Sequence, residues 1–350
     1  MSLQLDWTET ELLTTDAVAE PVVVNGRRCH GGFDSAGNYV SPRTAGRNPA
    51  IKAWQANHSN AFGTDIAEAP LEQWPASYPN LAQARLLLRH GVTEPVAVIL
   101  TRIGTVEGFG GFIRTVHCGD VQGHIVEPIA GTALAHLDKG LFEAHARDET
   151  GFGDELGHKD MWFAARDVAF DRAYSSDETT EMMARMGIAT GGAGSAARGE
   201  LAPLFPAVDQ RFESMMRFMV ALMFIEVSAF HSFAWAEALL DDRELCAGDG
   251  RAADLVRFIR SDETPHVEYL RTAISEVRDR TVRTTSGETV PGSEFIARIW
   301  DTAMSDSLGA RRAQFVETTN REIARSLQSL PDGDDVLEEF YALAESGSAA

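Results

Sequence analysis

The spacing of apolar residues changes near residue 120 of this 350-residue chain. Before that point, the stretches 21–29 and 33–42 predict two short strands that form a small β-hairpin, with turn signals at Asn25-Gly26 and Gly37-Asn38. A helix is predicted over 81–90, whereas the apolar run over 95–113 fits a strand or a helix equally well. Mixed, irregular structure is therefore expected over residues 1–118.

From about residue 124 onward, apolar residues recur at steps of three and four, which predicts helices. The first helical face runs toward Arg147 and carries Val126, Ile129, Ala133, Leu137, Leu141 and Ala144. Further helices are predicted over 161–170, 176–186, 207–243, 251–281, 294–304, 321–330 and 336–345. The stretch 175–206 includes a glycine-rich run that is typical of a long crossover connection.

One predicted helix is apolar and long enough to span a bilayer, over residues 218–240. Glu226, His231 and Glu237 interrupt it, and each would be costly in lipid. We therefore expect a fully buried helix of a soluble bundle and no membrane partner.

Composition narrows the class of protein further. Apolar residues make up 44% of the chain and charged residues 24%, as in soluble globular proteins. The 52 acidic and 31 basic residues give a formal charge of -21, which argues against nucleic acid as a partner. The three cysteines form no Cys-x-x-Cys pair, and the first residues carry no export signal, so a cytoplasmic protein is expected.

Two segments carry the same motif, Asp-Glu-x-x-His, at 154–158 and at 262–266. Residues three apart share one face of a helix, so Glu155 and His158 are expected to point the same way, as are Glu263 and His266. Two such faces turned inward would gather two carboxylates and two imidazoles around one point.

Two isolated glutamates strengthen this interpretation. Glu127 and Glu226 each follow an apolar pair in the matching contexts Ile-Val-Glu and Phe-Ile-Glu. Glu226 has apolar neighbours on both sides, and an unpaired buried carboxylate is very costly. A bound cation would compensate that cost.

The order Glu, Glu-x-x-His, Glu, Glu-x-x-His on four successive helices resembles the ferritin-like di-iron carboxylate proteins. The resemblance covers about residues 120–282. It implies a mainly α fold, with a ferritin-like four-helix bundle at 119–282 and the crossover at 175–206. An N-terminal extension (1–118), C-terminal helices (283–345) and a flexible tail (346–350) would complete the chain.

The resemblance also implies a metal-ligand set, which comprises Glu127, Glu155, His158, Glu226, Glu263 and His266. Oxygen and nitrogen donors without thiolate suit two iron ions, or manganese or a mixed Mn/Fe pair. By the same resemblance, Asp154 and Asp262 would each hydrogen-bond the histidine of the opposite motif.

Three points stay open at this stage. Glu143 competes with Glu127 as the ligand from the first helix, depending on where the first bundle loop lies. Tyr269, one turn after His266, is a candidate redox-active catalytic residue, although a structural tyrosine is the commoner case. His136 and His145 could reach the site but have no pattern behind them.

The expected function is a non-haem di-iron oxidoreductase that activates O2 and oxidises a small, apolar organic substrate. A ferroxidase or iron-handling protein and a di-manganese catalase or oxidase are the alternatives, with a metal-free helical scaffold as the non-enzymatic one. An electron-donor protein and a homodimeric state are expected partners.

Pro265 provides a structural check on this interpretation. Proline removes a helical hydrogen bond and clashes with the preceding turn. The helix is therefore expected to be distorted between Glu263 and His266.

Overall fold

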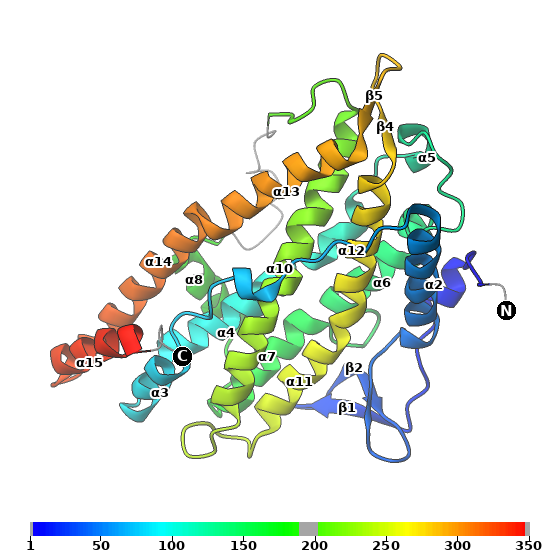
Figure 1. Ribbon diagram of the computed structural model, residues 1–350. Coiled ribbons are helices and arrows are strands. Elements are labelled where there is room, and N and C mark those ends of the chain that lie inside the picture. Colours follow the sequence, from blue (N-terminus) through cyan, green and yellow to red (C-terminus); the bar gives the residue numbers. More distant parts are fainter. Residues whose placement is uncertain (1–2, 189–201, 347–350) are drawn as a thin grey trace.

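Helices predominate in the computed structural model, which describes residues 3–188 and 202–346 (Figure 1). The N-terminal part contains α1 (Glu9–Leu13), β1 (Glu20–Val24), β2 (Arg27–Phe33), β3 (Tyr39–Val40), α2 (Thr44–Phe62), α3 (Leu81–Arg89) and α4 (Glu94–Glu107). The middle part contains α5 (Val121–His124), α6 (Phe142–Thr150), α7 (His158–Ala169), α8 (Ser176–Arg185), α10 (Gln210–Leu240), α11 (Arg251–Asp262) and α12 (Thr264–Arg278). The C-terminal part contains β4 (Thr281–Arg283), β5 (Thr289–Pro291), α13 (Gly292–Leu308), α14 (Ala310–Leu327) and α15 (Gly333–Ser346). Short turns link them at η1 (Leu71–Gln73), η2 (Gly110–Thr115), η3 (Leu134–His136) and η4 (Leu137–Leu141).

The predicted N-terminal hairpin is present as part of a three-stranded antiparallel sheet in the order β1-β2-β3. Asn25 and Gly26 join β1 to β2 with φ angles of 51° and 76°, the left-handed conformation that tight hairpin turns require. The apolar run over 95–113, which the sequence leaves open, forms helix α4 and then the turn η2.

Helix α10 is the central element of the helical body and confirms the long buried helix expected over 207–243. It packs against α11, α12 and α13, while α7 packs against α4 and α11 (Figure 1). One apolar core contains Met223 of α10, and a second contains Phe233 of the same helix. Glu226 lies between Met223 and Phe233 along the helix and is itself buried.

The distortion predicted at Pro265 is also present. Helix α11 ends at Asp262, and α12 begins at Thr264 with the proline in its first turn. Glu263 lies at the junction, and its carbonyl oxygen accepts hydrogen bonds from the N–H groups of His266 and Val267. Proline is tolerated here because the first turn of a helix needs no donor.

The prediction of a helix from residue 124 to Arg147 was wrong over most of that range. Residues 125–136 are largely irregular, and α6 begins only at Phe142. Gly140, with a φ angle of 124°, kinks the chain just before α6. The apolar residues of this stretch are buried as expected, except Val126, which is exposed. Most of them lie in irregular backbone, so the three- and four-residue spacing misled the assignment.

Helix α4 lies before the expected boundary at residue 118 yet packs against α7, so the N-terminal residues contribute to the helical body. Most of the glycine-rich part of the crossover expected at 175–206 lies outside the described residues, as do residues 347–350 of the expected tail. The C-terminal helices expected over 283–345 are present as α13 to α15.

Two stretches of the described chain are long and apolar enough to cross a membrane, Glu94–Thr115 and Gln210–Leu240. The most apolar windows of these stretches are 72% and 56% buried within the protein, as core helices of a soluble protein would be.

Candidate metal centre

Seven buried acidic and histidine side chains converge from five parts of the helical body. Glu107 ends α4, α6 contributes His145 and Glu149, and His158 begins α7. Glu226 comes from the middle of α10. Glu263 and His266 come from the α11–α12 junction. We call these seven residues the metal cluster.

The ligand atoms of the metal cluster form overlapping groups whose members all lie within 4.8 Å of one another. One group contains the four carboxylates, Glu107, Glu149, Glu226 and Glu263. Two further groups share Glu149 and His266, and add either His145 with Glu226 or His158 with Glu263. Glu149 belongs to all three groups, so it lies at the centre of the cluster.

A tight loop separates Glu149 from His158. Helix α6 ends at Thr150, and Gly151 follows with a φ angle of 80°. A Cβ atom at Gly151 would lie 2.3 Å from the carbonyl oxygen of Glu155, so only glycine fits. The loop over 151–157 then returns the chain to the cluster, where α7 begins at His158 itself.

The imidazole of His266 is fixed on both sides. Its Nδ1 atom lies 2.7 Å from Oε2 of Glu263 and 3.2 Å from Oε1 of Glu149. Its Nε2 atom lies 3.0 Å from Oδ2 of Asp148. Asp148 can accept a proton from Nε2, which would leave Nδ1, on the side of the glutamates, available to a metal ion.

His158 is arranged in the same manner. Its Nδ1 atom lies 2.7 Å from Oε1 of Glu263 and 3.3 Å from Oε1 of Glu149. Its Nε2 atom lies 3.5 Å from Oδ2 of Asp262. Asp262 therefore approaches the histidine of the opposite segment, as the resemblance implied. The aspartate paired with His266 is Asp148, rather than the expected Asp154.

His145 supplies a third imidazole, in the opposite ring orientation. Its Nε2 atom lies 3.3 Å from Oε1 of Glu226 and 3.7 Å from Oε1 of Glu149. Its Nδ1 atom lies 3.1 Å from the hydroxyl oxygen of Tyr269, which is fully buried. The candidate catalytic tyrosine thus contacts the cluster through His145.

Burial and mutual repulsion shift the pKa values of the cluster. Burial, and then the nearby charge of Glu263, raise the pKa values of Glu107 and Glu226 well above the usual carboxyl value. Burial opposes charge on His158 and His266, but Glu263 and the other neighbouring carboxylates together outweigh it and raise their pKa values. These four side chains are therefore biased to hold protons. The protons reduce the net negative charge of the cluster, and bound metal cations would reduce it in the same way.

Several ligand atoms point into the cluster without a hydrogen-bond partner among the described residues. They include Oε2 of Glu149, Oε2 of Glu226 and Nε2 of His145, all buried. A buried polar atom without a partner is costly. A divalent cation would satisfy all three at once, because each offers a lone pair toward the same centre.

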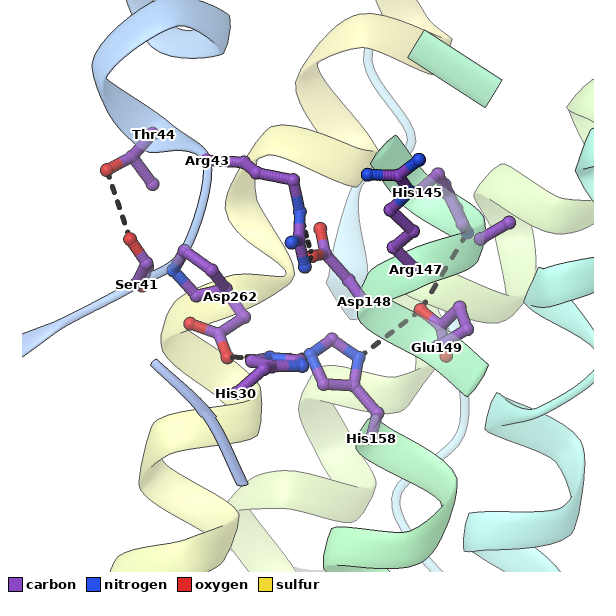
Figure 2. A network of polar contacts seen from close by, with 12 residues as sticks. His30, Ser41, Arg43, Thr44, His145, Arg147, Asp148, Glu149, His158 and Asp262 are labelled. Atoms are coloured by element: carbon purple, nitrogen blue, oxygen red, sulfur yellow. Dashed lines mark hydrogen bonds and ion pairs between the residues drawn. The ribbon is translucent and has the colours of Figure 1, made fainter. Parts of the chain in front are cut away.

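Residues of the N-terminal part surround the metal cluster. Arg43 donates from Nε to Oδ1 of Asp148 at 2.9 Å, and Nη1 of Arg47 lies 2.8 Å from Oδ2 of the same carboxylate. Nε2 of His30 lies 2.6 Å from Asp262. Figure 2 shows His30 beside His158 and Asp262, and Arg43 beside Asp148.

The expected ligand set needs two corrections, and the first concerns the first-helix glutamate. Glu127 accepts hydrogen bonds at 2.8 Å from the backbone N–H and the hydroxyl of Thr281, away from the cluster. Its competitor Glu143 lies 2.7 Å from Nε of Arg147 and is partly exposed. The structure instead places Glu107 in the cluster, because α4 carries the carboxylate there.

The second correction concerns the first Asp-Glu-x-x-His motif. Glu155 lies in the loop after α6 and forms an ion pair with Arg28 at 2.8 Å. Asp154 is exposed in the same loop. Only His158 of this motif enters the cluster, and the adjacent pair Asp148-Glu149 takes the positions expected for Asp154 and Glu155.

The four other predicted residues, His158, Glu226, Glu263 and His266, do lie together. Sequence reasoning missed Glu107 and Glu149, and it named His145 as able to reach the site without assigning it as a ligand. A signal existed for two of them: His145 and Glu149 are four residues apart on one helical face, and Asp148-Glu149 repeats Asp262-Glu263. Glu107 follows an apolar run, as Glu226 does.

Comparison with known proteins gives no relative. No protein family, curated protein or solved structure matches the chain. The assignment of the site therefore depends on its own chemistry.

Proposed function

We propose that this protein is a non-haem di-iron oxidoreductase of the ferritin-like type, which activates O2 to oxidise a small, apolar organic substrate. The observation that carries the proposal is the metal cluster: four carboxylates and three imidazoles, all buried, whose ligand atoms lie within 4.8 Å of one another in overlapping groups.

The residues fit two divalent ions in charge and in donor type. Four glutamates carry four negative charges when ionised, which two divalent cations balance. The donors are oxygen and nitrogen, and the described metal cluster contains no cysteine. Such a set suits iron or manganese better than copper(I) or structural zinc.

The order of the residues along the chain supports a ferritin-like site. Glu107, Glu149 with His158, Glu226, and Glu263 with His266 follow the order of a lone glutamate and then a glutamate with a histidine, twice over. The nine-residue spacing from Glu149 to His158 and the additional His145 depart from the usual pattern.

The groups of the cluster indicate how two ions would be held. His145, Glu226 and His266 would serve one position, and His158 and Glu263 the other, with Glu149 shared. Glu107 lies within reach of Glu149, Glu226 and Glu263. Bound iron would supply the electrons that reduce O2.

Neighbouring side chains hold the ligands in the required state. The carboxylates of Asp148 and Asp262 lie 3.0 Å and 3.5 Å from Nε2 of His266 and His158, where they would favour a proton on Nε2 and leave Nδ1 for metal. Tyr269 contacts Nδ1 of His145, which leaves Nε2 for metal. Tyr269 stays our candidate catalytic residue, because electron or proton transfer through His145 would connect it to the metal.

The remaining expectations are part of the same proposal. A cytoplasmic location, a homodimer and an electron-donor protein are consistent with the composition, and an acidic surface favours a basic donor. A di-manganese catalase or oxidase would use the same donor set, and a ferroxidase would oxidise iron itself.

Oxygen consumption by iron-loaded protein tests the proposal. The protein is loaded with Fe²⁺ without air, freed of unbound iron and mixed with O2 in an electrode chamber, with Glu226→Ala as the variant and Glu155→Ala as the matched control. We expect wild type and Glu155→Ala to consume O2 rapidly and Glu226→Ala to match iron in buffer. Equal, slow consumption by all three would contradict the proposal.

Two further outcomes separate the alternatives. Repeated oxidation of added Fe²⁺, with ferric iron accumulating beyond two ions per chain, would identify a ferroxidase. Rapid disproportionation of hydrogen peroxide by manganese-loaded protein, with no O2 consumption by the iron form, would identify a di-manganese catalase.

A further inference from the structure

Two aspartates occupy matching places beside the metal cluster. Asp148 and Asp262 each directly precede a glutamate of the cluster. Each is buried and lies against Nε2 of a histidine from the other half, His266 for Asp148 at 3.0 Å and His158 for Asp262 at 3.5 Å. The two halves of the centre therefore use the same device to orient a histidine.

The outer partners of Asp148 are two arginines. The Arg43 and Arg47 side chains are only 2% and 1% exposed, and both form ion pairs with this carboxylate. Burial alone would raise the pKa of Asp148, but the guanidinium groups of Arg47 and Arg43 hold it well below the usual value. Because arginine stays protonated, this position carries two fixed positive charges against one negative charge.

The outer partners of Asp262 are a histidine and a tyrosine. Nε2 of His30 lies 2.6 Å from Oδ2, and the Tyr39 hydroxyl donates to the same oxygen at 2.8 Å. Neither group carries a fixed positive charge. The formal charge of Asp262 and its two outer partners is therefore -1, and it would be zero if His30 carried an additional proton.

The difference matters because the outer carboxylate sets how strongly its histidine binds a metal. A carboxylate raises the basicity of the histidine it holds, and replacement of such partners typically changes metal affinity about 10- to 100-fold. The positive charges of Arg43 and Arg47 offset the negative charge of Asp148, so Asp148 raises the basicity of His266 less, and the two arginines also repel a nearby cation. Because neither outer partner of Asp262 carries a fixed positive charge, Asp262 keeps its full effect on the basicity of His158.

We propose that the segment from His30 to Arg47 makes the two metal positions unequal, so that a divalent ion binds first and more tightly at the position served by His158. The second ion then binds more weakly, at the position served by His266. This inference rests on the proposed di-metal function. It gives the N-terminal part a positioning role that the helical body alone cannot supply.

Titration of the metal-free full chain with Co²⁺ under argon, followed by visible absorption and calorimetry, tests the inference. We expect two steps that differ at least about tenfold in affinity. His158→Ala should remove the tight step, whereas His266→Ala should remove the weak one.

Arg47→Met keeps a side chain of similar length without charge. It should strengthen the weak step about tenfold and leave the tight step unchanged. Arg47→Lys, which keeps the charge, should preserve the gap between the steps. Arg28→Met is the matched control, because Arg28 lies just before this segment and pairs with Glu155 outside the cluster. Circular dichroism of each variant verifies that it folds.

Two outcomes would overturn the inference. If wild type binds two ions with equal affinity, or if Arg47→Met and Arg28→Met give the same curve, the positions are not made unequal by this segment, and the proposed function would still stand. If wild type binds no Co²⁺ at all, the inference and the proposed function both fail.

Discussion

The Nε2 atom of His266 lies 3.0 Å from Oδ2 of Asp148, a residue 118 positions earlier in the chain. This contact joins the first half of the metal centre to the second, and the pair formed by His158 and Asp262 joins them in the opposite direction. The two crossed contacts place Nδ1 of both imidazoles toward the glutamates. They are the structural basis for the metal-binding role assigned to the cluster.

Asp148→Asn should destabilise the fold, because it leaves Arg43 and Arg47 buried without a counter-charge. Removing one partner of a buried ion pair costs about 3–5 kcal/mol, and we expect a loss of about 3 kcal/mol in the free energy of unfolding in urea. Asp254→Asn is the control, since its ion pair with Arg257 is exposed and worth at most about 1 kcal/mol. Equal stability of the two variants would show that Asp148 does not neutralise the arginines.

Gly110→Ala should disturb the metal centre while leaving the fold intact. A Cβ atom at Gly110 would lie 2.7 Å from Cγ of Glu149 and 3.0 Å from Nε2 of His145, so both ligands must move. We expect metal affinity to fall about tenfold or more. Gly123→Ala, whose Cβ would meet the nearest atom, Oδ2 of Asp120, at 3.3 Å, is the matched control. Unchanged metal binding in Gly110→Ala would place the ions elsewhere.

Metal affinity should rise with pH. The pKa values of Glu107, Glu226, His158 and His266 are all raised, so these groups hold protons that metal ions must displace. We expect proton release on binding and weaker binding as the pH falls from about 8 to about 6. Calorimetry in buffers of different ionisation enthalpy counts the protons. Proton uptake, or affinity independent of pH, would contradict this assignment.

Several features of the fold and site are predictable from the sequence because they are local. The helix break at Glu263 follows from Pro265, which no helix interior accommodates without distortion. The burial of Glu226 follows from its apolar neighbours on α10. Glu263 and His266 share a face because three residues separate them.

The remainder of the site depends on contacts that are distant in sequence. The segment Asp-Glu-x-x-His at 154–158 has the same letters as its partner, but the loop after α6 places Glu155 beside Arg28. That loop is held by β2, where the N–H of His30 donates to the carbonyl of Leu156 at 3.0 Å. No local sequence pattern indicates that β2 pairs with this loop, so Glu155 was predicted as the metal ligand and Glu149 was not.

The N-terminal residues could not be assigned a role from the sequence for the same reason. A role for Arg43 and Arg47 follows only from their contact with Asp148, and a role for His30 only from its contact with Asp262. Glu127 shows that a local pattern can also suggest a ligand wrongly. Its apolar context resembles that of Glu226, but it lies in irregular backbone and accepts a hydrogen bond from the N–H of Thr281.

A separate buried carboxylate should make the stability of the fold depend on pH. Glu276 accepts hydrogen bonds from the N–H groups of Ala133 and Leu134, and burial raises its pKa from 4.5 to about 7. A raised pKa favours the protonated folded state. Its contribution to stability is therefore full below pH 4.5 and is lost as the pH rises through about 7.

Glu276→Gln removes this titration. We expect the variant to lose less unfolding free energy than wild type between about pH 5 and pH 8, measured by urea denaturation at each pH. Glu244→Gln, a substitution at an exposed position, should follow wild type. Parallel curves for wild type and Glu276→Gln would contradict the buried titration.

The metal content of matched variants tests the central claim most directly. Wild type, Glu149→Ala and Glu155→Ala are reconstituted with Fe²⁺ without air, freed of unbound iron, and measured by plasma emission spectroscopy. If the metal cluster is the site, wild type and Glu155→Ala should each retain about two ions per chain, and Glu149→Ala fewer than about one. Retention of iron by Glu149→Ala, its loss in Glu155→Ala, or no iron in wild type would contradict the account.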